Sequence, residues 1–269
     1  MLLLKGTKIQ SLDNQINKNP SLIPKLPFTL YASAGKGSGK SLVLLNLILS
    51  KDLLANKFNQ IYVINPTAKL DQKWDSIKNV PGILNINTRL INLMKKNNKT
   101  IKVMDFSNET DYEGNSVISD ENFIEDFNLD FLKELIEEQT QIIKKYGKEN
   151  ADTILLIFDD TISNNYWKSE LMSKMIFNSR HFKISICITS QSYKSLPKKL
   201  RLNMSLLLLF YTANEQELKT IYEENSASTS FKQFNKVYNQ ITSKSFNFIT
   251  INYQNDKQHI LQDAFQSFV

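Results

Sequence analysis

The stretch Ala34-Gly35-Lys36-Gly37-Ser38-Gly39-Lys40-Ser41 follows the apolar run Phe28–Ser33 and opens a second apolar segment that begins at Leu42. Three of the seven glycines of the chain lie within five positions of this stretch. Glycines let successive backbone N–H groups curl around phosphate oxygens, and the N-terminus of a following helix adds its dipole. The order strand, glycine-rich loop and helix therefore predicts a phosphate-binding loop.

Within this loop the residue types assign separate roles. The Lys40 ammonium would reach the β- and γ-phosphates of ATP, and the Ser41 hydroxyl would ligate Mg²⁺. The first position of the motif is Ala34 where glycine is usual, which is tolerable if that residue needs no positive φ. The alternative is a flexible Gly/Ser turn without a ligand. The expected nucleotide-binding residues are Gly35, Lys36, Gly37, Ser38, Gly39, Lys40 and Ser41.

A second chemical feature is the pair Asp159-Asp160, which ends the apolar run Ile154–Phe158. A carboxylate at the end of a strand holds Mg²⁺ in enzymes with phosphate loops, and the next acid orients and deprotonates the attacking water. We assign Asp159 to the metal and Asp160 to the water. Taken alone, the pair is equally consistent with a strand exit or a helix cap.

Gln191 follows another apolar run, Ile184–Thr189. In open parallel sheets, ligands bind beyond the carboxyl ends of the strands, so the loop, the acid pair and Gln191 would share one edge. There Gln191 would hydrogen-bond the γ-phosphate or the water; the alternative is a polar strand end facing solvent. The runs Ile61–Ile64 and Ile101–Phe106 separate the loop from the acid pair in sequence, which favours P-loop ATPases with an added central strand.

The chain as a whole alternates short apolar runs with helix-length segments, which predicts an α/β fold with a mostly parallel sheet flanked by helices. Because most of these runs are apolar almost throughout, we expect helices to cover both faces of the sheet. We expect one P-loop ATPase domain over residues 1–269, with a lead-in over 1–25 and a core over 26–262. The expected strands are Phe28–Ser33, Ile61–Ile64, Ile101–Phe106, Ile154–Phe158, Ile184–Thr189, Ser205–Phe210 and a C-terminal hairpin, Phe246–Tyr253 with Gln258–Phe265, turning at Asn255-Asp256. The expected helices are Lys40–Leu54, Asn122–Tyr146, Tyr166–Asn178 and Glu215–Glu223, with a further helix after Ser230 and a surface loop over Asn108–Asp120.

Composition narrows the class of protein. The chain has 269 residues, 41% hydrophobic, which is enough for a core and excludes wholesale disorder. A single cysteine, Cys187, argues against a disulfide framework, and two histidines argue against a histidine-built zinc site. No apolar stretch approaches the roughly 18 residues of a membrane span. These features predict an intracellular protein without a membrane segment.

The net charge of +6 permits contact with nucleic acid without establishing it. Lysine supplies nearly all the positive charge, and the only arginines are Arg89, Arg180 and Arg201. Two of these flank the run Ile184–Thr189. Guanidinium grips phosphate oxygens bidentately, so an arginine suits stabilisation of ATP in a neighbouring subunit. We prefer Arg201 for this role over Arg180; the alternative is a surface charge and a helix-end cation.

The order of motifs resembles the viral branch of the FtsK–HerA superfamily, the genome-packaging ATPases of poxviruses, giant viruses and virophages. The resemblance spans residues 26–262. Its motifs are the phosphate loop, Asn65-Pro66-Thr67 with Trp74, the acid pair, Arg180-His181, Thr189-Ser190-Gln191, Leu196-Pro197, Arg201-x-Asn203 and the closing hairpin.

This resemblance implies a ring of identical subunits, a hexamer or a pentamer, that uses ATP and Mg²⁺ to push double-stranded DNA into a preformed capsid. It implies capsid or portal-vertex proteins as partners and the viral factory in the host cytoplasm as the place of action, with the virion as a second location. Lys40 and Ser41 carry over as phosphate and Mg²⁺ contacts, and Asp159 and Asp160 as the acid pair. Gln191 carries over as the sensor of the γ-phosphate, and Arg201, less firmly Arg180, as the subunit-bridging arginine.

Three other functions stay open at this point. A cellular-type DNA translocase or helicase would share the motor and lack a capsid partner. A nucleotide kinase would need an arginine-bearing lid, yet no arginine lies between Arg89 and Arg180. A nucleotide-binding scaffold for assembly would bind ATP and not hydrolyse it, which Asp160 leaves open because glutamate is more usual at that position.

Overall fold

The apolar runs of the sequence form the strands of one sheet in the computed structural model. The structure describes residues 25–50, 53–55, 57–68, 70–74, 77, 122–162, 165–225, 230–253, 260–263 and 266–267. The strands in these ranges are β1 (Thr29–Ser33), β2 (Gln60–Ile64), β3 (Phe123–Ile124), β4 (Ile154–Phe158), β5 (Ile184–Ser190), β6 (Leu206–Phe210), β7 (Phe248–Asn252), β8 (Ile260–Asp263) and β9 (Gln266–Ser267). Their order across the sheet is β3-β2-β4-β5-β1-β6-β7-β8-β9.

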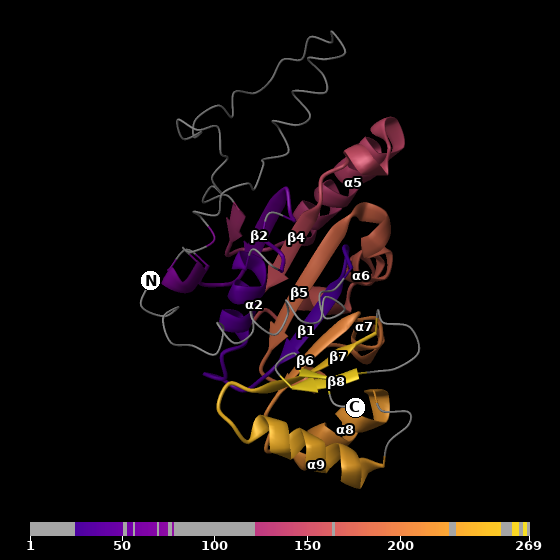
Figure 1. The fold of residues 1–269 in the computed structure, drawn as a ribbon. Coiled ribbons are helices and arrows are strands. Elements are labelled where there is room, and N and C mark those ends of the chain that lie inside the picture. The colour runs from indigo at the N-terminus through magenta and orange to yellow at the C-terminus, as the bar shows by residue number, and fades with distance from the viewer. Residues whose placement is uncertain are drawn as a thin grey trace.

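Strands β3 to β6 in this order pair in parallel, and β7, β8 and β9 continue the sheet in antiparallel pairing. The prediction of a mostly parallel α/β sheet that ends in a C-terminal hairpin is therefore confirmed. Figure 1 shows the hairpin strands β7 and β8 beside β6. The α/β class follows from strands that are apolar throughout, since helices bury both faces.

The helices are α2 (Lys40–Leu49), α5 (Leu129–Tyr146), α6 (Glu170–Phe182), α7 (Lys198–Arg201), α8 (Glu215–Asn225) and α9 (Phe231–Thr242). Helix α2 covers one face of the sheet, whereas α5, α6, α8 and α9 contribute to the core on the other (Figure 1). Strand β1 shows the division, because Leu30 joins the α2 side and Tyr31 the opposite side. Within the described residues, no helix combines the length and apolarity that a membrane crossing requires.

Three of the expected helices differ clearly from the observed ones. The helix expected over Tyr166–Asn178 is α6, which spans Glu170–Phe182. The segment expected to be helical from Asn122 begins its helix at Leu129, because the Asn128 side chain caps it by accepting a 2.9 Å bond from the Phe131 N–H. Phe123–Ile124 instead forms β3 against β2, with Phe123 opposite Val63. The helix expected over Lys40–Leu54 ends at Leu49. The expected strand Ile101–Phe106, the loop Asn108–Asp120 and the hairpin turn at Asn255-Asp256 lie outside the described residues.

An added strand does separate the phosphate-loop strand from the acid-pair strand, as predicted. The order is β4-β5-β1, so the added strand is β5, Ile184–Ser190. Strand β5 follows both β1 and β4 in sequence. The prediction of an added strand is therefore correct, although it was based on the runs that lie between β1 and β4 in sequence, and β5 is not one of those runs.

Candidate nucleotide-binding and catalytic site

Parallel pairing brings the ends of β1, β4 and β5 to one edge of the sheet. Ser33 of β1 lies opposite Ser190 of β5, and Phe158 of β4 lies opposite Ile188. The Ala34 N–H donates a 3.0 Å hydrogen bond to the Ser190 carbonyl, which fixes the start of the phosphate loop beside β5. The loop, the acid pair and Gln191 therefore meet at the carboxyl edge, as the sequence predicted.

The phosphate loop has the backbone that its glycines permit. Gly37 has φ 77° and Gly39, the N-cap of α2, has φ 91°, both in the left-handed region. Ala34 is not among the described residues with positive φ, so alanine at this position introduces no backbone strain. The Lys40 side chain folds back along the loop, and its Nζ donates to the Ala34 carbonyl at 3.3 Å.

Asp159 is the centre of a buried polar network and is 1% exposed. Its Oδ1 accepts hydrogen bonds from Ser41 Oγ at 3.0 Å and Thr189 Oγ1 at 2.6 Å. Its Oδ2 accepts from Asn65 Nδ2 at 2.9 Å and lies 3.0 Å from Lys73 Nζ. Burial raises the pKa of Asp159, but the Lys73 charge and these hydrogen bonds outweigh it and hold the pKa below its usual value. The lowered pKa favours the ionised carboxylate, which is the form that binds a cation.

Lys73 was not predicted as a site residue. It lies on a short 3₁₀ helix, Gln72–Trp74, and forms a 2.6 Å ion pair with Asp71 in addition to its contact with Asp159. Burial lowers the pKa of Lys73, and the two carboxylates reverse that effect and raise it. No motif marks this lysine, because only the fold places the turn after β2 beside the end of β4.

Asn65 and Thr189 were also missed as contacts of Asp159, although both follow from strand ends. Asn65 comes directly after β2, which pairs with β4, and Thr189 lies near the end of β5, the other neighbour of β4. Asn65 is itself held in a turn, since its Oδ1 accepts from the Thr67 N–H at 2.7 Å. Polar residues at the ends of strands flanking an acidic strand end were the signal that could have found them.

Asp160 differs from Asp159 in being exposed and in having φ 56°. This left-handed conformation is uncommon outside glycine, and Asp and Asn tolerate it best. The Asp160 N–H donates to Thr189 Oγ1 at 3.1 Å, and Gln191 Nε2 donates to its carboxylate oxygens at 3.0 Å and 3.2 Å. Gln191 therefore holds the second carboxylate of the pair at the mouth of the site.

These groups line a groove of about 540 Å³, which we call the metal-side groove. It is lined by Lys36–Leu42, Asn65–Thr67, Asp71, Lys73, Asp159, Asp160 and Gln191. Ser41 and Asp159 present two oxygen atoms at one point, and a hard cation such as Mg²⁺ is held by few carboxylates together with substrate phosphates. The donor set thus fits a magnesium–triphosphate ligand, with the Asp160 carboxylate, held by Gln191, beside it.

Arg201 does not reach this groove. Its side chain and that of Glu224 on α8 are 6% and 7% exposed, and they form a double hydrogen bond of 2.7 Å and 3.0 Å. Burial raises the pKa of Glu224, but the bonds from Arg201 outweigh it and lower the pKa. Leaving Glu224 unpaired in this position would be costly. Arg201 is therefore paired within its own chain, and the choice between Arg201 and Arg180 as the subunit-bridging arginine stays a prediction.

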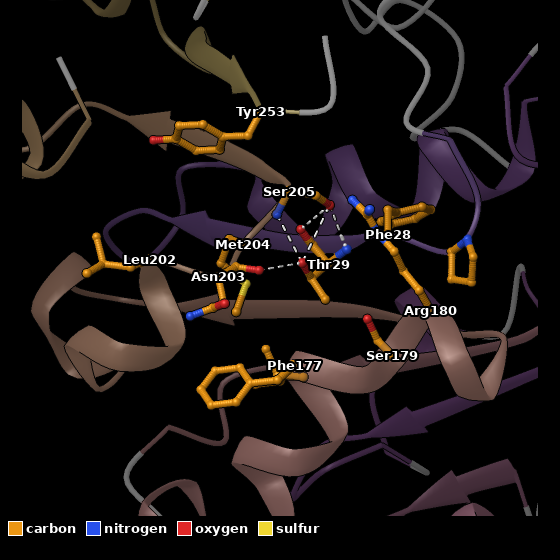
Figure 2. A pocket seen from close by; sticks show the side chains of 12 residues that line it. Phe28, Thr29, Phe177, Ser179, Arg180, Leu202, Asn203, Met204, Ser205 and Tyr253 are labelled. Atoms are coloured by element: carbon orange, nitrogen blue, oxygen red, sulfur yellow. Dashed lines mark hydrogen bonds between the residues drawn. The ribbon is translucent and has the colours of Figure 1, made fainter. Parts of the chain in front are cut away.

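Arg180 is exposed and lies near the end of α6, at the opposite edge of the sheet from the phosphate loop. Figure 2 shows it at a pocket of about 280 Å³, together with Phe28 and Phe177. Thr29 and Ser205 hydrogen-bond to each other at the same pocket and tie β1 to the start of β6. Within one chain, the structure does not bring Arg180 to the metal-side groove.

Comparison with known proteins places this site in a family context. Residues 114–257, more than half of the chain, match the family described as Poxvirus A32 protein. This segment contains the acid pair and Gln191, and the phosphate loop precedes it. Uncharacterized protein 075L of Invertebrate iridescent virus 6 is 28% identical over 101 residues, which are 37% of this chain and 39% of that protein. The match thus spans about two fifths of that relative.

Two of the solved structures with a similar fold come from viruses. The genome packaging NTPase B204 from Sulfolobus turreted icosahedral virus 2, in complex with ATP-γS, has a TM-score of 0.56 and 16% identity, over 89% of this chain and 98% of that one. B204, the DNA-packaging ATPase from Sulfolobus turreted icosahedral virus, has a TM-score of 0.56 and 17% identity over the same shares. At this identity the comparison establishes the fold.

Proposed function

Because the chain belongs to the poxvirus A32 protein family, we propose that it is a viral genome-packaging ATPase that drives double-stranded DNA into a preformed capsid. The similarity of its fold to B204, which has been solved with ATP-γS, supports nucleotide binding at the same kind of site. The phosphate loop lies outside the segment matched to the family, so it supports the proposal independently.

The binding step follows from the phosphate loop. The backbone N–H groups between Ala34 and Ser41 would cradle the phosphates, and the α2 dipole favours negative charge there. Lys40 would leave the Ala34 carbonyl and contact the β- and γ-phosphates. Ser41 and Asp159 would hold Mg²⁺, which when bound neutralises charge on the transferring phosphoryl group.

The hydrolytic step rests on Asp160. Its exposed carboxylate would accept the proton of the attacking water, with Gln191 fixing its orientation through the pair of hydrogen bonds to its oxygens. The Thr189 hydroxyl donates to the Asp159 carboxylate and accepts from the Asp160 N–H, so it ties the Asp160 backbone to the Asp159 side chain. Because Gln191 hydrogen-bonds the proposed general base Asp160, loss of the γ-phosphate would change the contacts of Gln191 at the end of β5.

The proposal includes a ring of subunits in which an arginine of one subunit acts on the ATP of the next. Of the two arginines that the structure describes, Arg201 is paired with Glu224 and Arg180 is exposed. We therefore give the subunit-bridging role to Arg180, acting on the ATP of the next subunit in a homo-oligomeric ring. The partners would be double-stranded DNA and capsid or portal-vertex proteins, and the viral factory of the host cytoplasm would be the place of action, with the virion as a second location.

The observation that carries the proposal is the 3.0 Å contact between Ser41 and Asp159, which joins the phosphate loop to the acid pair. The test is phosphate release from ATP by the purified chain, with and without duplex DNA. We expect turnover that DNA stimulates, that Lys40→Ala removes and that Lys133→Ala, an exposed lysine on α5, leaves intact. Wild-type protein that binds ATP without releasing phosphate would indicate an assembly scaffold and overturn the proposal.

A further inference from the structure

The phosphate loop has a second groove on its other flank, with a volume of about 690 Å³. This groove, which we call the aromatic groove, shares Lys36, Gly37 and Ser38 with the metal-side groove. Its other wall comes from the end of β6 and from residues 242–247, the segment between α9 and β7, which Figure 1 shows close to the loop between β1 and α2. A volume in this range is typical of small-molecule sites.

Two exposed aromatic rings line the aromatic groove. Phe246 is 58% exposed and Tyr211 is 55% exposed, whereas most large apolar side chains of the described chain are buried. A Cβ atom built on Gly39 would come within 2.9 Å of Phe246 Cδ1, so the Phe246 ring lies directly over the last glycine of the phosphate loop. Phe246 also has φ 66°, which is rare for a bulky residue.

The charge of the aromatic groove favours an anionic ligand. Lys36 and Lys244 are both exposed at it, and none of the described residues that line it is acidic. The hydroxyl-bearing and amide side chains Thr242, Ser243, Ser245 and Asn247 supply polar atoms beside the two rings. Flat aromatic walls with a few polar groups and a cationic rim suit a nucleotide.

The direction of a bound triphosphate follows from the acid pair. Ser41, Asp159 and Asp160 line the metal-side groove and would take the γ-phosphate end. The opposite end of the triphosphate then points away from them, across Lys36, Gly37 and Ser38, toward Phe246. The aromatic groove is continuous with the phosphate loop on that side and offers the ring surfaces that a base needs.

We propose that the aromatic groove binds the nucleobase of the triphosphate held by the phosphate loop, stacked against Phe246 and Tyr211. This inference rests on the proposed nucleotide binding at the same loop and adds the residues that recognise the base. Stacking is tolerant of base identity, so these rings supply affinity for any nucleoside triphosphate and prefer purines, whose π-surface is larger.

The test compares ATP with magnesium tripolyphosphate, which has the same charged chain and no base, by calorimetric titration of the full chain. We expect Phe246→Ala and Tyr211→Ala each to raise the Kd for ATP about ten-fold. The Kd for tripolyphosphate should stay within two-fold of the wild-type value. Phe177→Ala, which removes an exposed ring at the opposite edge of the sheet, is the matched control and should leave both Kd values unchanged.

The outcomes separate the two proposals. If the wild type binds ATP and both ring variants bind it with the same Kd, the proposed base site is wrong. The proposed function would then still stand. Loss of tripolyphosphate binding in proportion to ATP would also overturn the base site, because the rings would then act only by supporting the phosphate loop. A wild-type chain that binds neither ligand would overturn the proposed function and the base site together.

Discussion

Ser41 Oγ lies 3.0 Å from Asp159 Oδ1, although 118 residues separate the two along the chain. The contact arises because β1 and β4 run parallel on either side of β5 and end at the same edge. It places a hydroxyl and an ionised carboxylate at one point beside the phosphate loop.

Asp160→Asn should separate binding from hydrolysis. The amide keeps the shape of the side chain and tolerates φ 56°, but it cannot accept the proton of water. We expect kcat for phosphate release to fall by about 10²–10⁴-fold, the usual contribution of a general base, with the Kd for ATP little changed. Turnover by the variant at the wild-type rate would assign the base to another residue.

Lys73→Met should tighten metal binding in the absence of nucleotide. The Lys73 ammonium lies 3.0 Å from Asp159 Oδ2, so a divalent cation must compete with it for the carboxylate. Removing the ammonium should lower the Kd for Mn²⁺, measured by electron paramagnetic resonance on the nucleotide-free chain, by several-fold. Lys219→Met, at an exposed ion pair on α8, should change nothing. A weaker Mn²⁺ affinity in the Lys73 variant would contradict this account.

Arg201→Met should act on stability. The variant leaves the buried Glu224 carboxylate without its ion-pair partner, so we expect a loss of about 3–5 kcal/mol in the free energy of unfolding, measured by urea titration. Arg201→Met combined with Glu224→Gln should recover part of that loss. A variant with wild-type stability and no DNA-stimulated turnover would restore Arg201 as the subunit-bridging arginine.

The same pair gives a pH dependence with a defined sign. Since folding lowers the pKa of Glu224, its contribution is complete above the unfolded value of about 4.3 and is lost as the pH falls through the lower folded value. The wild type should therefore lose more stability than Glu224→Gln as the pH is taken below about 4. Equal pH dependence in the two proteins would show that the pair contributes no linked stability.

Arg180→Ala should leave folding intact and reduce turnover, because the residue is exposed in its own chain. Loss of an arginine acting across subunits typically costs about 10³-fold or more. An equimolar mixture of Arg180→Ala and Lys40→Ala chains should regain activity, since Lys40→Ala subunits still offer Arg180 to intact neighbouring sites. A mixture as inactive as its two components would argue against a role between subunits.

The carboxyl-edge chemistry could be predicted from sequence because it depends on strand ends. The phosphate loop, Asp159-Asp160 and Gln191 each follow an apolar run, and parallel strands bring such ends together without further information. The same rule would have found Thr189 and Asn65. These positions are fixed by local pattern and strand direction alone.

The remaining features depend on contacts that no local pattern encodes. Lys73 contacts Asp159 because tertiary packing positions the turn that carries Lys73. Arg201 forms its ion pair with Glu224, 23 residues further along the chain. Strand β3 has only two residues, and its Phe123 also fits the helical repeat of the segment that follows, so only pairing with β2 reveals it. Phe246 was expected in the C-terminal hairpin, but it lies just before β7, with its ring over Gly39.

The most direct test of the shared magnesium site is phosphate release from ATP as a function of Mg²⁺ concentration in the wild type, Ser41→Ala and Asp159→Asn, at fixed duplex DNA. We expect both variants to need more Mg²⁺ for half-maximal turnover and Asp159→Asn to be at least about 100-fold slower at saturation. An Asp159→Asn protein with the Mg²⁺ dependence and rate of the wild type would show that Asp159 does not hold the magnesium.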